Sequence, residues 1–94
     1  MSYTNVTERV VRVAFDLMEY LKCKVSDFYS VSFFGKENKV VFTPTYGYRA
    51  KSLYGKVKKL FSDVTEEVTG EFVVLAFRYG GVEAIFNFRK NVLR

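Results

Sequence analysis

Histidine, tryptophan and glutamine are absent from this 94-residue sequence, and cysteine occurs only once, at Cys23. Without histidine, and with no base partner for Cys23, the usual nucleophile and base pairs of enzymes are missing. A single cysteine also excludes an intrachain disulfide and a cysteine-based zinc site. We therefore expect a protein that is not an enzyme and holds no metal or cofactor, with Cys23 as a half-buried residue near a helix end.

The sequence also lacks a long apolar run. A membrane span needs about 18 apolar residues, and neither such a run nor an apolar signal segment is present. Apolar residues make up 49% of the chain and aromatic residues 18%, which is enough for the core of one globular domain. We expect a single domain over residues 1–94 and a cytoplasmic, intracellular location. The frequent Val, Phe, Tyr, Lys and Glu weakly indicate a thermophilic source, such as an archaeon or one of its viruses.

Apolar periodicity predicts a helix followed by two strands in the first half of the chain. Apolar residues repeat at helical spacing from about residue 5 to residue 24. The period becomes two over residues 27–34, turn residues occupy 35–38, and a second strand follows over residues 39–43. The expected register pairs Phe34 with Lys39 and buries one face of both strands.

The second half of the chain has the same layout. A helix is expected over residues 48–64 and a near-continuous apolar strand over residues 71–79. Gly80-Gly81 is typical of a two-residue type I′ turn, because both turn positions need positive φ, and a last strand follows it. Glu66-Glu67 falls between the helix and the strand, where we expect solvated charges in a connection.

These elements predict an α+β fold of order α-β-β-α-β-β. We expect a two-layer sandwich, with a four-stranded antiparallel sheet and both helices on one face. The register of the last hairpin pairs Arg78 with Glu83, so charge and hydrophobicity favour the same pairing. The halves also match when Val40-Val41-Phe42 is aligned with Ala84-Ile85-Phe86. An old duplication of a helix-plus-hairpin unit and chance similarity between two segments of the same patterning both explain this match.

Positive charge is concentrated on the predicted second helix. The formal net charge is +5, and no acidic residue lies between Arg49 and Ser62. Cations at a helix N-terminus oppose the helix dipole, so Arg49 and Lys51 point to a phosphate or another anion. A solvated helix face that binds nothing remains the alternative, and the acidic residues that follow, Asp63, Glu66, Glu67 and Glu71, could fold back and neutralise part of its charge. The predicted nucleic-acid-binding residues are Tyr46, Tyr48, Arg49, Lys51, Lys56, Lys58 and Lys59.

The sheet face turned away from the helices is the second candidate surface. On the predicted registers it is too apolar to be left in water. Base stacking with arginines on phosphates is one explanation, but a protein interface, either a homodimer or a docked partner, is favoured. The predicted interface residues are Phe28, Phe34, Phe72, Val74, Arg78, Ile85 and Arg89.

Two functions of different classes follow from these surfaces. The leading hypothesis is a small, non-enzymatic nucleic-acid-binding protein that contacts phosphates through its basic second helix. The alternative is a protein-interaction module, a homodimeric adaptor or a small inhibitor, that uses the apolar outer face. An enzyme is a third and weaker possibility, and neither a membrane nor a small-molecule substrate is expected as a partner.

Overall fold

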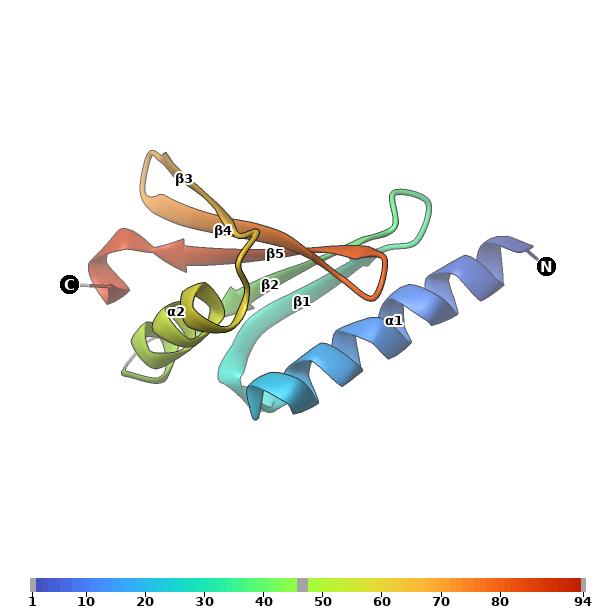
Figure 1. Ribbon diagram of the computed structural model, residues 1–94, viewed down its shortest axis with the longest axis horizontal. Coiled ribbons are helices and arrows are strands. Elements are labelled where there is room, and N and C mark those ends of the chain that lie inside the picture. Colours follow the sequence, from blue (N-terminus) through green and yellow to red (C-terminus); the bar gives the residue numbers. More distant parts are fainter. Residues whose placement is uncertain (1, 46–47, 94) are drawn as a thin grey trace.

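The computed structural model describes residues 2–45 and 48–93 and arranges them as two α-helices against one side of a twisted sheet (Figure 1). The second helix ends at Leu60 and not at residue 64, so it is shorter than predicted. Short 3₁₀ turns, η1 and η2, precede the first strand and follow the last. The elements are α1 (Ser2–Leu21), η1 (Val25–Asp27), β1 (Phe28–Phe34), β2 (Lys39–Pro44), α2 (Tyr48–Leu60), β3 (Thr65–Thr69), β4 (Phe72–Tyr79), β5 (Val82–Arg89) and η2 (Lys90–Val92).

The sheet corrects the predicted fold. It has five strands in the order β1-β2-β5-β4-β3 and is mixed, so the expected four-stranded antiparallel sheet is wrong. At its centre β2 and β5 run parallel, while the other neighbouring strands are antiparallel. The reason is that β4 pairs with β3 on one side and with β5 on the other. Only β5 is then available to β2, and these two strands run in the same direction.

The additional strand, β3, occupies the segment that the sequence analysis assigned to a connection. Its residues 65–69 pair with β4, and the turn between the two strands contains Gly70 at φ +49°. All five residues of β3 are exposed, so the strand has no alternation of apolar and polar residues to reveal it. Glu66 and Glu67 therefore lie in an edge strand and not in a loop.

Both predicted hairpin registers are confirmed. Phe34 faces Lys39 in the first hairpin, and Arg78 faces Glu83 in the second. Gly80 and Gly81 have φ values of +58° and +79°, as a type I′ turn requires. Turn chemistry and alternation thus fix the pairing within each hairpin.

A stack of phenylalanine rings forms the centre of the core between sheet and helices. The ring of Phe86 lies 4.5 Å from that of Phe42 and 5.8 Å from that of Phe77. The helices complete the core with smaller aliphatic side chains, because α1 and α2 each turn one apolar face to the sheet. The helical core residues are Val10, Ala14, Leu17, Met18, Leu21, Ala50, Leu53 and Val57.

The two matching segments of the predicted repeat lie directly side by side. Val40 neighbours Ala84 and Phe42 neighbours Phe86 in the parallel pair. A two-fold axis along these strands would place the two helices on opposite faces of the sheet, whereas both lie on the same face (Figure 1). The similarity of the halves therefore does not correspond to an internal two-fold symmetry.

Candidate interaction surfaces

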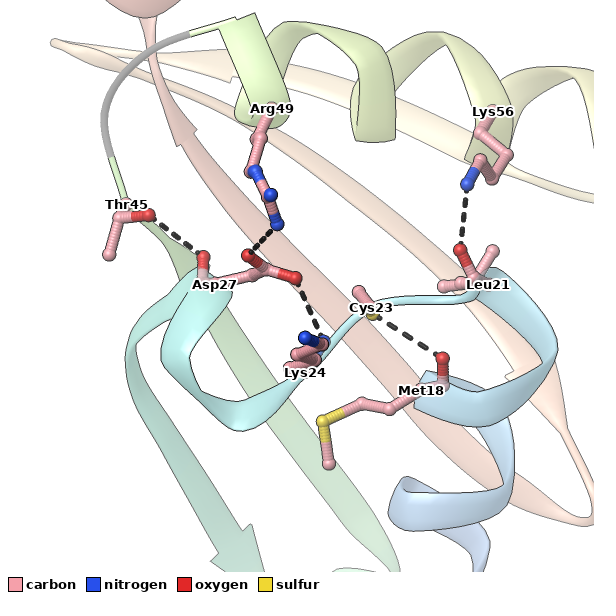
Figure 2. Close-up of polar contacts among 8 residues, drawn as sticks. All are labelled: Met18, Leu21, Cys23, Lys24, Asp27, Thr45, Arg49 and Lys56. Carbon is pink, nitrogen blue, oxygen red and sulfur yellow. Dashed lines mark hydrogen bonds and ion pairs between the residues drawn. The ribbon is translucent and has the colours of Figure 1, made fainter.

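The N-terminal end of α2 is held against η1 by Asp27 (Figure 2). The guanidinium of Arg49 donates to Oδ1 of Asp27 at 2.8 Å, and the backbone N–H of Lys24 donates to Oδ2 at 2.8 Å. The hydroxyl of Thr45 donates to the Asp27 carbonyl at 3.0 Å. The hydrogen bond from Lys24, followed by that from Arg49, lowers the pKa of the Asp27 carboxyl below its usual range. Arg49 thus has a structural partner on a distant segment.

Lys56 completes the C-terminal cap of α1. The chain leaves the helix at Lys22, whose φ is +58°, and the N–H of Cys23 bonds to the carbonyl of Met18 at 2.9 Å, which is the pattern of a Schellman cap. The ammonium of Lys56 donates to the free carbonyl of Leu21 at 2.7 Å (Figure 2). A cation at this end also complements the helix dipole, so Lys56 joins the two helices.

Lys58 is bound to the unpredicted strand β3. Its ammonium lies 2.6 Å from Oε1 of Glu66, and the hydroxyl of Tyr54 donates to Oε2 at 2.6 Å. The hydrogen bond from Lys58 is the main reason that the pKa of Glu66 is lowered. The bond to Glu66, followed by burial, raises the pKa of Tyr54. This cluster attaches β3 to α2.

The structure thus gives Arg49, Lys56 and Lys58 partners within the chain. Of the other residues predicted to bind nucleic acid, Lys51 and Lys59 are exposed. Tyr46 lies outside the described residues, and so does the side chain of Tyr48. Asp27 was not predicted as a partner of Arg49, because it lies 22 residues away in the sequence and leaves no local signal. Glu66 belongs to the acidic stretch after the helix that was considered as a source of neutralising charge, and its ion pair with Lys58 agrees with that alternative.

Asp27 should make stability depend on acidity. Because its pKa is lowered by folding, Asp27 stabilises the fold above its unfolded pKa of about 3.9, and this contribution is lost as the pH falls through the lower folded value. We expect Asp27→Asn to reduce the unfolding free energy by about 1 kcal/mol at pH 7, with the difference from the wild type vanishing in strong acid. Urea unfolding from pH 2 to pH 7 measures this. Asp63→Asn, at an exposed position, is the control and should change the unfolding free energy at pH 7 by less than about 0.5 kcal/mol.

The outer face is the side of the sheet turned away from α1 and α2. In its middle, a cross-strand row places Ser32, Val41, Ile85, Ala76 and Thr65 next to one another. Val74 and Phe72 extend the apolar part of this row along β4. These five apolar residues, Val41, Phe72, Val74, Ala76 and Ile85, are all partly exposed, and we call them the apolar stripe.

A β-bulge removes one predicted residue from the outer face. The register shifts between Phe28 and Ser30, so that Tyr29 is the additional residue and is 81% exposed. Phe28 is consequently turned to the helix side, where it is only 6% exposed and its ring lies 5.1 Å from that of Phe42. Phe28 therefore belongs to the core and not to the predicted interface, because a bulge reverses the alternation of side chains.

Two cations of the outer face lie over aromatic rings. Arg89 is 5.6 Å from the ring centroid of Phe72, and Lys39 is 5.4 Å from that of Phe34. Phe72 and Arg89 also line a shallow groove of about 300 Å³, together with Tyr29, Ser30, Thr43, Pro44 and Thr45. Both helices lie on the other side of the sheet (Figure 1). Leu93, after η2, packs against the core, which is on the same side of the sheet as the helices. The outer face thus stays open across the described part of the chain.

The single cysteine is poorly suited to chemistry. Cys23 is half-buried, and burial, assisted by the negative charge of Asp27, raises the pKa of its thiol to about 11. Its Sγ contacts the carbonyl of Met18 at 3.5 Å. A thiol with this pKa carries very little of the thiolate form that reacts at neutral pH.

Comparison with protein-family models, curated proteins and solved structures gives no match for this chain. Within residues 2–45 and 48–93, no helix has the length and apolar character needed to cross a membrane. The same residues bring together no group of three or more side chains of the types that ligate metals. The features of the described residues that bear on function are therefore the basic helix α2 and the outer face of the sheet.

Proposed function

We propose that this protein is a protein-interaction module that binds a partner on the outer face of its sheet. The apolar stripe carries the proposal, because it is continuous across β2, β5 and β4 on a face that neither helix covers. A contiguous apolar patch bordered by polar residues is typical of an interface. In this proposal the protein acts inside the cell, and a thermophilic, archaeal or viral source stays a prediction.

The surroundings of the stripe favour a partner with an acidic rim. Arg89, Lys39 and Arg78 border the stripe, and two of these cations lie over exposed or half-buried aromatic rings. Glu83 faces Arg78 across the hairpin and offsets part of this charge. An apolar side chain of the partner would contact Ile85 and Phe72, and a carboxylate beside it would reach Arg89.

Nucleic-acid binding through α2 stays a prediction, with less support than the interface. A phosphate would have to compete with Asp27 for Arg49, with the α1 carbonyl for Lys56 and with Glu66 for Lys58. Each of these contacts also joins two elements of the fold. The positive charge of this helix therefore has a structural use that needs no external ligand.

Affinity capture from an extract of the native source tests the proposal. Wild-type protein and a Lys59→Glu variant should retain the same protein partner, whereas Ile85→Glu should weaken capture by at least about tenfold, as expected for a central interface residue. Circular dichroism verifies that both variants fold. Capture of nucleic acid that is lost in Lys59→Glu and at higher salt would instead favour the phosphate-binding hypothesis. Equal loss of the partner in both variants would reject the outer face.

A further inference from the structure

The two edges of the sheet differ in how they resist pairing with another chain. β3 is short and carries Glu66 and Glu67, and charged side chains are a common protection of sheet edges. β1 has seven residues, Phe28–Phe34, and none of them is charged. Within the described residues β1 pairs with β2 alone. Its outer edge is therefore a template to which another strand can add.

We propose that β1 pairs antiparallel with β1 of a second copy of this chain, so that the two five-stranded sheets form one continuous sheet. The absence of charge favours a second copy as the occupant, since two β1 strands can pair without bringing any charge to the new contact, whereas β3, the other edge strand, carries Glu66 and Glu67. Pairing of β1 with β3 would place glutamates beside phenylalanines. That head-to-tail pairing would also propagate from copy to copy, whereas β1 with β1 closes as a dimer.

Symmetry and the bulge together fix the register of this pairing. The two-fold axis that relates two antiparallel strands of one sheet is perpendicular to the sheet, so each face of the sheet is mapped onto itself. The axis passes between two directly opposed residues, so one residue of β1 must face the same residue of the second copy. The regular part of β1, beyond the bulge, is Ser30–Phe34, and its middle residue is Ser32. With Ser32 on the axis, Val31 faces Phe33 of the second copy on the helix side, which is a favourable aromatic and β-branched pair.

Exposed aromatic side chains lie along this edge in both layers. Phe33 is 36% exposed and Phe34 is 39% exposed, on opposite faces of β1. On α1, the flank that carries Tyr20 faces β4, because the ring of Tyr20 contacts that of Tyr79. Since β1 and β4 lie on opposite sides of the central strands, the other flank of α1 faces β1. That flank contains Phe15, which is 48% exposed. The dimer would cover aromatic surface in the sheet and in the helix layer together.

This dimer does not depend on the proposed function, because it uses the edge of the sheet and forms without a partner. Introducing a charge at Ser32 tests it on purified protein by sedimentation velocity. Ser32 is exposed, so Ser32→Lys and Ser32→Glu should fold, while each places two like charges opposite each other on the axis. We expect each variant to raise the dimer dissociation constant about five- to tenfold, and an equimolar mixture of both to restore dimers.

Thr65 provides the matched control, because it ends the same cross-strand row on the opposite edge of the sheet. Thr65→Lys and Thr65→Glu should leave the dimer unchanged. A monomeric wild-type protein at high concentration, or a dimer insensitive to both charges at Ser32, would overturn the proposal. Open-ended oligomers that disappear in the Thr65 variants would identify head-to-tail pairing and would also reject it.

Discussion

Phe86→Ala should lower the unfolding free energy by about 3–5 kcal/mol, the usual range for truncating a buried phenylalanine. Phe86 is fully buried in the centre of β5, and its ring stacks against those of Phe42 and Phe77. Removing the ring leaves a cavity that both helices and the central strands enclose, so the surrounding side chains cannot collapse without moving the sheet. Urea or thermal unfolding followed by circular dichroism measures the loss.

Phe72→Ala is the control for this prediction. Phe72 lies on the outer face and is partly exposed, with Arg89 over its ring. We expect its truncation to cost about 1–2 kcal/mol, clearly less than Phe86→Ala, since Phe72 is partly exposed and its removal leaves no enclosed cavity. A similar cost for the two variants would mean that the outer face is covered in the folded protein, which would contradict both the described core and the proposed interface.

Gly80→Ala and Gly55→Ala should change stability in opposite directions. Gly80 has a φ of +58°, and a Cβ built there would lie 3.2 Å from a methyl group of Val13 on α1. A left-handed conformation costs an L-residue about 1–2 kcal/mol, and the contact adds to this cost. Gly55 lies inside α2, and a Cβ built there would meet no other part of the described chain within 4 Å, so alanine there should stabilise the fold by about 1 kcal/mol.

Unfolding curves of the two glycine variants decide this prediction. The substitution adds the same methyl group in both, so effects of composition on the unfolded chain largely cancel. A stabilising effect of Gly80→Ala would show that the tip of the second hairpin does not keep its type I′ turn against α1. A destabilising effect of Gly55→Ala would show that α2 does not form as described.

Local patterning was sufficient to predict both helices and both hairpins. Gly80-Gly81 fixes a two-residue loop, and the cross-strand pair Arg78 with Glu83 agrees with it. Residues 35–38 fix the first hairpin in the same way. These features depend on neighbours in sequence, which is why alternation and turn residues identify them.

The arrangement of the sheet depends on contacts that the sequence does not display. β3 has no buried side chain and hence no alternation, so it was assigned to a connection. Without β3, nothing prevents β4 from joining β2, and a fully antiparallel sheet is then the simplest arrangement. The bulge at Tyr29 was also not predicted, because no glycine marks it, and it moved Phe28 from the interface into the core.

The candidate basic site shows the same limit for charges. Composition along the chain reveals that α2 is cationic, but it does not reveal where Asp27, Leu21 and Glu66 lie in the fold. Once these partners are known, Arg49, Lys56 and Lys58 become contacts between elements. The outer face is different, because its composition follows from strand alternation. All of its predicted residues except Phe28 lie where alternation places them.

The parallel seam between β2 and β5 has a consequence for the order of folding events. Each hairpin can close within its own half of the chain, but the seam joins residues as distant as Lys39 and Glu83. Closing so long a loop costs more entropy than closing a short one and is compensated only when the seam is complete. We therefore expect hairpin formation to be rapid and early, and docking of the two halves along this seam to limit the folding rate.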